Sequence, residues 1–544
     1  MRRKATSDLW WKNAVVYCLD VETFLDADGD GCGDLVGLTE RLDYLAGIGV
    51  SCLWLMPFYP SEQRDDGYDI TDFYGIDGRL GTPGDFSELM RTARDRGIRV
   101  IADLVMNHTS DRHPWFQAGR DRDSPFHDFY VWADEKPAEK PGDVVFPDRE
   151  TSNWQWDPKA RQWYLHRFYS HQPDLNVASP AVRDEIAQVV GYWLDQGLAG
   201  FRVDAVPFML EPMGMPEGSL QDPHELICEL RRFMGRRKGE AILMGEVNLA
   251  PEQQREFFGD EDGDELHMVL SFSVNQAMYL AFAREQAAPL VEALSALPEI
   301  PADCQWANFV RNHDELTLDK LPEPERQEVF DAFGPEQRHQ LFGRGLRRRL
   351  PSMVAGDPDR IRLAYSLAFS LPGTPVLFYG EEIGMEENLD IPGRMSVRSP
   401  MQWSGERHRG FTTGEVPCRP LAPGAAEVAV QRRDPASLLS WMERLIRRRR
   451  ECPELGWGRI TVLDAGDEAV FAHRADWDGS VIMAVHSFAA EPREVTLDVD
   501  GAEAAVDLFG DAELVPSGGR VEVALGRYGH RWFRLRQPGQ RVAP

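Results

Sequence analysis

The stretch Gly200-Phe-Arg-Val-Asp204-Ala decides how this 544-residue chain folds. It is a short apolar run that ends on an acid, and two others do the same: Leu243-Met-Gly-Glu246-Val-Asn and Phe309-Val-Arg-Asn-His313-Asp314. Each places a carboxylate where a buried strand would leave a sheet, and the spacing leaves room for a helix between strands. A single acid at a strand end is usually a helix cap or one half of an ion pair. Three such acids, accompanied by Arg202 and His108, indicate one shared site.

Apolar runs of the same kind recur along the chain and predict eight buried strands. They lie near residues 14–21, 50–58, 100–107, 198–206, 241–247, 267–274, 306–312 and 374–380. Helical patterns separate many of them, for instance at 35–48, 86–96, 182–196 and 223–237. Nearly continuous apolar runs are typical of parallel strands that are buried on both faces. The sequence therefore predicts an α/β fold, a (β/α)₈ TIM barrel whose site lies at the carboxyl ends of its strands.

The barrel is expected to comprise residues 1–108 and 177–455, because the regular spacing breaks between the third and fourth runs. Residues 109–176 are rich in Trp, Pro, Asp and His, and they predict a small domain inserted after the third strand. We expect this inserted domain to project over the mouth of the barrel.

Two later segments also depart from the barrel pattern. Residues 317–358 predict a polar helical insertion, and their basic stretch 344–349 is expected to form a solvated helix face. After a helix at 436–450, residues 456–544 alternate apolar and polar positions between Gly, Asp and Pro. That pattern predicts a C-terminal antiparallel β-sandwich domain.

Composition limits the partners of the chain. The formal net charge of −29 argues against nucleic acid, because phosphate binding needs clustered positive charge. Apolar runs stay well below the roughly 20 residues that span a bilayer, so no membrane partner is expected. Seven scattered Cys residues without a CxxC pair favour reduced thiols and a cytoplasmic location over disulfides or a zinc site. The sequence leaves open whether the chain forms a homo-oligomer.

Paired acids at strand ends suit the cleavage of glycosidic bonds, which requires a carboxylate and a separate protonated acid. The chain resembles the α-amylase family of glycoside hydrolases and transglucosylases over nearly its whole length. The motifs that carry this resemblance are Asp103-Leu-Val-Met-Asn107-His108, Gly200-Phe-Arg202-Val-Asp204-Ala, Glu246, Asn312-His313-Asp314 and Gln172-Pro-Asp174-Leu-Asn176. The resemblance implies the same architecture as the pattern of runs: barrel, inserted domain and C-terminal β-domain.

The resemblance also implies roles for the three acids. Asp204 is implied as the nucleophile of a covalent glucosyl-enzyme intermediate, and Arg202 is suited to keep it ionised. Glu246 is implied as the general acid and then base, with a pKa raised towards about 6–7. Asp314 resembles the third acid, which grips sugar hydroxyls. A retaining enzyme would hold the carboxyl groups of Asp204 and Glu246 about 5–5.5 Å apart.

Substrate-binding residues are implied in the same way. His108 and His313 resemble the family's hydroxyl-binding histidines, although an isolated His is most often a core residue. Tyr68 resembles the aromatic platform beneath the sugar. Asp65 resembles the residue that pairs with an Arg near Arg398 to close the non-reducing end; alone, it could equally be a turn residue. Such a pair would turn a through-cleft into a pocket for disaccharide-sized substrates.

The loop after the first strand has oxygen ligands at alternate positions, which suits a hard cation such as Ca²⁺. It is not an EF-hand, because position twelve is Gly37. By resemblance to the family's calcium site, the ligands would be the side chains of Asp26, Asp28, Asp30 and Asp34 and the carbonyl of Cys32. A metal-free acidic turn is the alternative.

Within the family, the chain is most similar to the trehalose synthases, which isomerise maltose and trehalose. Shared stretches include Arg64-Asp-Asp-Gly-Tyr and Arg311-Asn-His-Asp-Glu-Leu-Thr-Leu. Leu249 replaces a Gln of that subfamily's pattern, and Ser271 and Ser273 replace His and Pro; we expect all three on the acceptor side.

The resemblance implies an enzyme that moves glucosyl units between small α-glucosides such as maltose or trehalose. A mainly hydrolytic α-glucosidase or α-amylase-type enzyme is the alternative. A non-catalytic barrel relative that serves as a binding protein is more remote, because all three acids are present.

Overall fold

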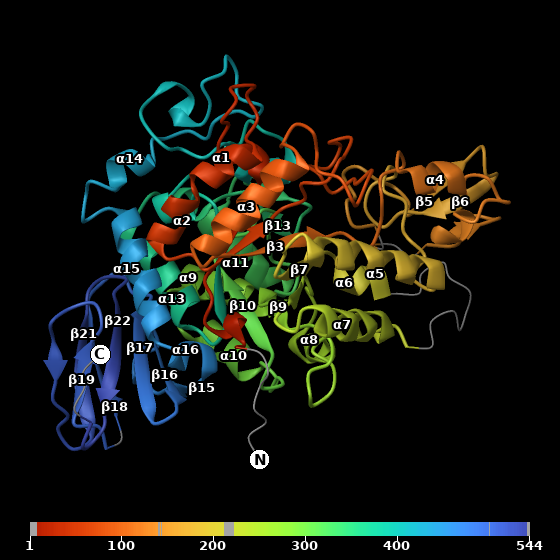
Figure 1. Ribbon diagram of the computed structural model, residues 1–544. Helices are drawn as coiled ribbons and strands as arrows, with labels where there is room; N and C mark the ends of the chain where they lie inside the picture. Colours follow the sequence, from red (N-terminus) through yellow and green to blue (C-terminus); the bar gives the residue numbers. More distant parts are fainter. Residues whose placement is uncertain (1–7, 140–141, 143, 211–221, 500, 541–544) are drawn as a thin grey trace.

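A closed barrel of eight parallel strands forms the centre of the molecule (Figure 1). The computed structural model describes residues 8–139, 142, 144–210, 222–499 and 501–540. The strands lie in the order β1-β14-β10-β9-β8-β7-β3-β2. Their bounds are β1 Val16–Leu19, β2 Cys52–Leu55, β3 Arg99–Leu104, β7 Gly200–Val203, β8 Ile242–Gly245, β9 Met268–Leu270, β10 Gln305–Phe309 and β14 Thr374–Phe378.

All eight apolar runs form the predicted strands, and nearly every barrel residue is buried. Burial on both faces explains why the runs show no alternation of polar and apolar residues. One predicted strand was too long: β9 ends at Leu270, and the helix α9 (Phe272–Arg284) begins two residues later. The sequence prediction of a TIM barrel is confirmed.

Helices surround the barrel where the sequence predicts them. The pattern at 35–48 forms two helices, α1 (Leu35–Glu40) and α2 (Leu42–Ile48), which divide at Arg41. The other three are α3 (Pro83–Asp95), α5 (Pro180–Asp195) and α7 (Glu225–Arg237). Thr82 and Asp85 form a reciprocal capping box that starts α3.

The remaining helices are shorter or lie outside the predicted patterns. They are α4 Pro114–Gly119, α6 Val206–Leu210, α8 Pro251–Glu256, α10 Ala288–Ser295, α11 Glu323–Phe333, α12 Leu350–Met353, α13 Pro358–Ser370, α14 Val428–Gln431, α15 Leu438–Glu451 and α16 Glu454–Trp457. Short 3₁₀ segments lie at Trp10–Lys12, Val21–Thr23, His127–Phe129, Gln337–His339, Glu381–Ile383, Gly393–Val397 and Arg407–Gly410.

The segment between β3 and β7 carries its own small antiparallel sheet. Its strands are β4 (Trp132–Ala133), β5 (Trp154–Asp157) and β6 (Gln162–Leu165), with β6 in the middle. A backbone bridge between His108 and Asp174 joins the two ends of the segment, and a second bridge links Tyr130 in its interior to Leu175. The domain boundaries at 109 and 176 stay a prediction.

The segment after β10 contains α11 and a second small sheet, made of β11 (Leu316–Thr317), β12 (Gln340–Leu341) and β13 (Gly345–Leu346). The prediction of a solvated helix face at 344–349 is wrong. The backbone there is not helical between β13 and α12, and the guanidinium of Arg349 is buried against the carbonyls of Val397 and Tyr379. The guanidinium of Arg349 thus donates to backbone carbonyls that would otherwise be buried without a hydrogen-bond partner.

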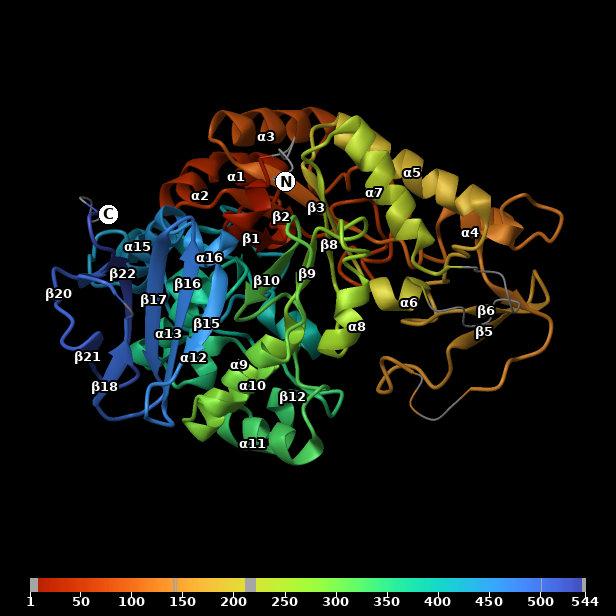
Figure 2. The ribbon, with the colours of Figure 1, turned by 90° about the horizontal axis from the view of Figure 1, so that it is seen from below.

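The C-terminal part is antiparallel, as predicted. One sheet contains β15 Arg459–Leu463, β16 Val470–Trp477, β17 Ser480–Ser487, β22 His530–Arg536, β19 Ala504–Asp507 and β20 Glu513–Leu514, in that spatial order. A second sheet pairs β18 (Arg493–Asp498) with β21 (Arg520–Leu525), and an apolar core joins the two. This sheet domain and the inserted β5–β6 hairpin lie on opposite sides of the barrel in both ribbon views (Figures 1 and 2).

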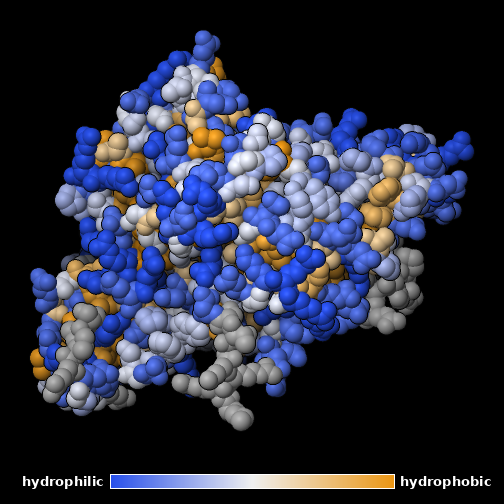
Figure 3. Space-filling model, in the orientation of Figure 1, coloured by the Kyte–Doolittle hydropathy of each residue, from blue (hydrophilic) through white to orange (hydrophobic). Residues whose placement is uncertain are grey.

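The visible face of the molecule is mainly hydrophilic, with apolar residues in scattered patches (Figure 3). Among the described residues, no helix has the length and hydropathy that crossing a membrane requires.

Candidate active site

The three predicted acids meet in one cavity at the carboxyl ends of the barrel strands. Asp204 directly follows β7, Glu246 directly follows β8, and Asp314 follows β10 by five residues. The cavity has a volume of about 350 Å³ and is also lined by Tyr68 and His108. The barrel therefore presents the carboxylates at the face where the sequence predicts them.

Arg202 holds the two acids that follow β7 and β8. Its guanidinium is buried, and its Nη1 donates to Asp204 at 2.5 Å and to Asp103 at 2.7 Å. Its Nη2 donates to Glu246. Because alternate residues of an extended chain face the same side, Arg202 near the end of β7 and Asp204 just after it point the same way, at the barrel mouth. The structure brings Arg202 and Asp204 into the direct contact that the sequence leads us to expect.

The two acids differ in protonation. Burial raises the pKa of Asp204 to about 6, while the positive charge of Arg202 acts in the opposite direction. Burial raises the pKa of Glu246 further, to about 7, with Arg202 opposing and the neighbouring charges of Asp204 and Asp314 adding to the rise. In this order Asp204 loses its proton first, which suits a carboxylate nucleophile beside a protonated acid.

The backbone after Asp204 is strained. Ala205 has φ 49°, in the left-handed region that side chains other than glycine's rarely adopt. Its amide nitrogen lies 3.3 Å from Oε2 of Glu246 and donates to it. Such strain persists where the surroundings hold it, and here it directs one more donor at the acid.

Asp314 lies in a strongly positive setting. Its oxygens accept from Arg394 at 3.0 Å and Arg398 at 2.8 Å, and His313 Nε2 lies 3.0 Å away. Although burial alone would raise the pKa of Asp314, these neighbours hold it well below its usual range. Asp314 is therefore an ionised acceptor, which fits binding of sugar hydroxyls rather than proton transfer.

The arginine that pairs with Asp65, expected near Arg398, is Arg394 and not Arg398 itself. Arg394 Nη2 donates to Asp65 Oδ1 at 2.6 Å, and both residues line the cavity. The other Asp65 oxygen accepts from Gln172 at 2.9 Å. Asp65 and Arg394 thus form a fixed polar wall of the cavity.

Arg398 has a different place. Its guanidinium is fully buried and does not reach the cavity lining; it donates to Asp66, to Asp314 and to the carbonyl of His313. Arg419 also pairs with Asp66. Arg398 therefore contacts Asp314 without lining the cavity. Asp314, Arg398, Asp66 and Arg419 form a row of alternating charges.

The predicted sugar-binding residues are assembled around Asp103 and Asp314. Tyr68 lines the cavity, and its hydroxyl donates to Asp103 at 3.1 Å. His108 also lines the cavity, and burial lowers the pKa of its imidazole to about 4, so it is neutral. His313 is not among the lining residues; its Nε2 lies 2.9 Å from the Tyr68 hydroxyl and beside Asp314.

The two insertions meet at the cavity. The rings of Phe146 and Phe342 lie with centroids 5.2 Å apart, and Arg344 donates to the carbonyl of Val145 at 2.9 Å. Phe146 and Arg344 line the cavity together with Arg394, whose guanidinium lies over the Phe146 ring at 5.2 Å. Sequence reasoning missed these residues, because nothing local marks loop residues that become neighbours only on folding.

The expected acceptor-side residues are only partly found. Leu249 lines the cavity beside Asn248, whose amide donates to Asp319 at 2.9 Å. Ser271 and Ser273 do not line it; Phe272 between them does. The reason is that α9 begins at Phe272, which turns the ring towards the cavity while Ser271 stays buried at the barrel wall.

The acidic loop after β1 brings three of its four carboxylates together. Oxygens of Asp26, Asp28 and Asp34 lie within 4.8 Å of one another. Asp30 instead accepts from the backbone N–H of Cys32 at 2.7 Å. Three converging carboxylates fit a hard cation with oxygen ligands, although Asp26 and Asp34 also accept backbone hydrogen bonds.

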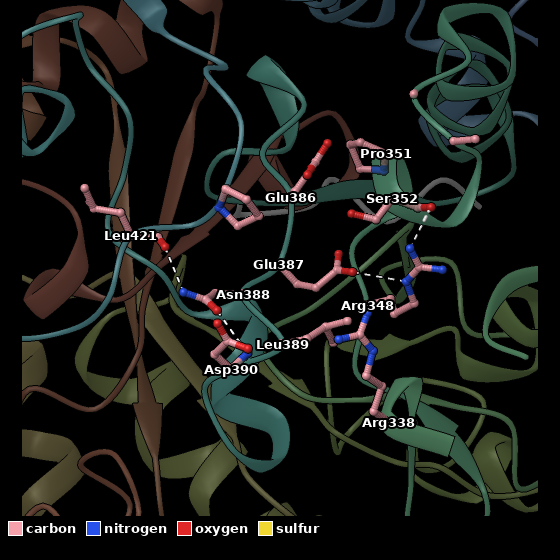
Figure 4. A pocket seen from close by; sticks show the side chains of 13 residues that line it. Arg338, Arg348, Pro351, Ser352, Glu386, Glu387, Asn388, Leu389, Asp390 and Leu421 are labelled. Atoms are coloured by element: carbon pink, nitrogen blue, oxygen red, sulfur yellow. Dashed lines mark hydrogen bonds and ion pairs between the residues drawn. The ribbon is translucent and has the colours of Figure 1, made fainter. Parts of the chain in front are cut away.

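A second cavity, of about 600 Å³, is larger and more open (Figure 4). Among its lining residues, Arg348 lies 3.1 Å from Glu387, and the side-chain amide of Asn388 donates to the carbonyl of Leu421 at 2.8 Å. It holds none of the three acids, so the chemistry belongs to the smaller cavity.

Fold and site together define a member of the α-amylase family. Residues 20–320 and 345–458 match the alpha amylase catalytic domain, and residues 479–534 match the sucrose hydrolase-like C-terminal domain. Since the first match exceeds half of the chain, the protein belongs to this family of enzymes. The unmatched residues 321–344 fall within the predicted insertion.

The most similar relatives include enzymes named trehalose synthase. That of Pimelobacter sp. is 40% identical over 553 residues, which cover 97% of this chain and 96% of the relative. The trehalose synthase/amylase of Mycobacterium tuberculosis is 40% identical over 544 residues, covering 97% and 90%. An oligo-1,6-glucosidase of Halalkalibacterium halodurans is more distant, at 29% identity over 539 residues, covering 89% and 91%.

Solved structures of the same fold include the trehalulose synthase MutB from Pseudomonas mesoacidophila MX-45. It superposes with a TM-score of 0.78 at 28% identity, and the match covers 97% of this chain and 99% of that one. The similarity extends over barrel, insertion and C-terminal domain together.

Proposed function

We propose that this protein is a retaining α-glucosyl-transferring enzyme that isomerises maltose-sized α-glucosides, with hydrolysis as a side reaction. The observation that carries the proposal is the cavity of about 350 Å³ in which Asp204 and Glu246 share one arginine and the Asp65–Arg394 pair forms a wall. The 40% identity to enzymes named trehalose synthase supports the same reaction class.

The first half-reaction uses two carboxyl groups in different states. Asp204 is ionised and attacks the anomeric carbon, while Glu246 donates its proton to the departing oxygen. A glucosyl ester on Asp204 forms, and the released sugar carries the proton from Glu246. Arg202 and the amide of Ala205 contact Glu246 throughout. Asp314, held ionised by Arg394 and Arg398, binds hydroxyl groups of the glucosyl ring.

The second half-reaction decides the product. Glu246, now ionised, removes a proton from the acceptor, whose oxygen attacks the anomeric carbon; the bond from that carbon to Asp204 breaks and the carboxylate is released. If the released sugar turns and attacks through another hydroxyl, the product is an isomeric disaccharide; if water attacks, it is free glucose. Leu249 and Phe272 give the acceptor side of the cavity an apolar part. An apolar surface holds an acceptor sugar less firmly than polar groups would. Correct orientation of an acceptor lowers the activation barrier by several kcal/mol, so a loosely held sugar competes less well with water.

Calcium is the cation that we propose for the loop 26–34. Asp26, Asp28 and Asp34 supply converging oxygens, and a divalent hard ion would neutralise their repulsion. The proposed role is structural, since the loop follows β1 while the three acids follow other strands.

We also propose a cytoplasmic location and small α-glucosides such as maltose or trehalose as the substrates. All seven cysteines are free thiols, which suits a reducing compartment.

One experiment separates the activities. The enzyme is incubated separately with maltose, trehalose and sucrose, and the products are resolved over time by anion-exchange chromatography. Interconversion of maltose and trehalose with some glucose supports the proposal. Glucose alone from maltose would replace it with a hydrolytic α-glucosidase, and unchanged sugars in all three incubations would exclude both.

A further inference from the structure

Two cysteines that lie far apart in the sequence come together beside the acidic loop. The sulfur atoms of Cys32 and Cys418 and a carboxylate oxygen of Glu22 all lie within 4.8 Å of one another. Cys32 belongs to the loop after β1, and Cys418 belongs to an exposed segment that follows the last 3₁₀ turn.

The two backbones are already in contact there. The N–H of Cys418 donates to the carbonyl of Gly31 at 2.7 Å, and the N–H of Asp26 donates to the carbonyl of Phe411 at 3.0 Å. A Cβ added to Gly31 would lie 2.3 Å from the carbonyl oxygen of Val416, so the chains pack backbone against backbone. The two sulfur atoms therefore lie close together between backbone segments that are in direct contact, which is the proximity that a disulfide requires.

A metal ion is the less suitable occupant of the cluster. Glu22 is paired with two cations, Arg79 at 3.4 Å and Arg419 at 3.3 Å. These arginines would repel a third positive charge, and a metal would have to compete with them for the only carboxylate. A disulfide, in contrast, carries no charge, so the neighbouring arginines do not repel it.

We propose that Cys32 and Cys418 form a reversible intramolecular disulfide when the protein meets a peroxide. The first of the two sulfurs to react attacks a peroxide oxygen as a thiolate; the O–O bond breaks, hydroxide leaves and takes up the proton of that thiol to form water, and a sulfenic acid remains. The other sulfur then attacks the sulfenic sulfur and displaces its hydroxyl, which departs as water with the proton of the second thiol. Overall, two thiols lose two electrons and two protons, and one hydrogen peroxide becomes two water molecules.

The disulfide would cross-link a segment that is connected to Asp314 in the active site by a series of ion pairs. Arg419 follows Cys418 and pairs with Asp66, Asp66 pairs with Arg398, and Arg398 donates to Asp314. A bond between Cys32 and Cys418 would close a long loop of the chain, and closing a long loop strongly restricts the unfolded state. The oxidised protein is therefore expected to hold this row of charges at temperatures at which the reduced protein loses it.

The test uses the full chain, first reduced and then freed of reductant. A slight excess of hydrogen peroxide is added, free thiols are alkylated, and an unreduced digest is analysed by mass spectrometry. We expect a Cys32–Cys418 cross-link, a fall from seven titratable thiols to five in denaturant, and a melting temperature higher by about 2 °C or more. Dithiothreitol should reverse all three changes.

The variants Cys418→Ser and Cys32→Ser must each lose the cross-link, and Cys418→Ser changes only an exposed side chain. The matched control Cys228→Ser, which removes a half-buried thiol elsewhere, must keep it. Seven remaining thiols, oxidation of Cys418 without a cross-link, or a bond between two copies of the chain would each overturn the proposal. Since none of these measurements depends on sugar turnover, the result does not rest on the proposed function.

Discussion

Arg394 donates a 2.6 Å hydrogen bond to Asp65 across 329 residues of sequence. Both side chains are largely buried, at 16% and 10% exposure, so salt screens their attraction only weakly. Arg394 also contacts Asp314, whereas Arg398, four residues later, contacts Asp314 and Asp66. One arginine therefore faces the cavity and the other supports it, and substitutions should separate the two roles.

Arg394→Ala should lower kcat/KM for maltose about 100-fold or more, because Asp65 and Asp314 lose a partner in the cavity. Activity on longer maltooligosaccharides should fall less, since the wall at that end is opened. Arg398→Ala should instead lower stability by about 3–5 kcal/mol, because the carboxylate of Asp66 is left buried without full compensation. Chemical denaturation and steady-state kinetics measure both effects. Arg338→Ala, at an exposed surface pair, is the control and should change neither.

Asp204→Asn should reduce turnover at least 1,000-fold while the circular dichroism spectrum and melting temperature stay near those of the parent. An amide cannot form the glycosyl ester. Asp195→Asn, at an exposed site on α5, is the matched control and should retain full activity. NMR of the first-formed product should show retained anomeric configuration. Inverted product, or substantial activity in the Asn variant with its sequence confirmed, would refute the assignment of Asp204.

The pH profile of kcat/KM should be a narrow bell. The active form carries Asp204 ionised and Glu246 protonated, so activity falls below about pH 6, where Asp204 gains a proton. It also falls above about pH 7, where Glu246 loses its proton. Glu246→Gln should abolish the alkaline limb when a substrate with a good leaving group is used, because no proton is then needed. An alkaline limb that persists in that variant would assign the limb to another group.

Leu249→Gln should shift the product ratio towards isomerisation. The added amide can hold an acceptor sugar in the cavity that Leu249 lines, and water then competes less well. We expect the fraction of glucose among maltose products to fall at least two-fold. Leu294→Gln on α10, which is not a lining residue, is the control for a general loss of packing. An unchanged fraction in Leu249→Gln would mean that the acceptor is held elsewhere.

Chelation should lower thermal stability more than it changes kcat. A bound ion at about 100 times its Kd would contribute about 2.7 kcal/mol, and removing it leaves three facing carboxylates unneutralised. Differential scanning fluorimetry with and without EGTA measures the shift, and added Ca²⁺ should restore it. Asp28→Asn should abolish the response, whereas Asp72→Asn, outside the loop, should preserve it. An identical melting temperature with and without chelator would leave the acidic turn metal-free.

The sequence predicts the barrel well because a parallel strand that is buried on both faces must be apolar along its whole length. The acids at the ends of β7, β8 and β10 are marked by this same transition from apolar run to carboxylate. The sequence cannot predict which of two arginines reaches the cavity. Arg394 follows Gly393 at φ 60° inside a 3₁₀ turn, and that turn, which depends on tertiary contacts, directs the side chain.

The run 344–349 illustrates the same limit. Basic residues are usually solvated, so the pattern favours an exposed helix, yet Arg349 is buried because distant carbonyls of Val397 and Tyr379 need donors. The partnership of Cys32 and Cys418 is likewise invisible until two loops meet. Features that depend on one segment of sequence can be predicted from its pattern. Features that depend on contacts between two distant segments can be identified only from the folded structure.

The pairing of β1 with β14 has a consequence for synthesis on the ribosome. Val16 of β1 is in register with Val376 of β14. On this side, β1 therefore lacks its partner strand until more than two thirds of the chain has been synthesised. At about 5–20 residues per second, the first strand is without β14 for roughly 20–70 s. During that time the edge of β1 that later pairs with β14 has no partner from that strand, and unpaired strand edges favour aggregation.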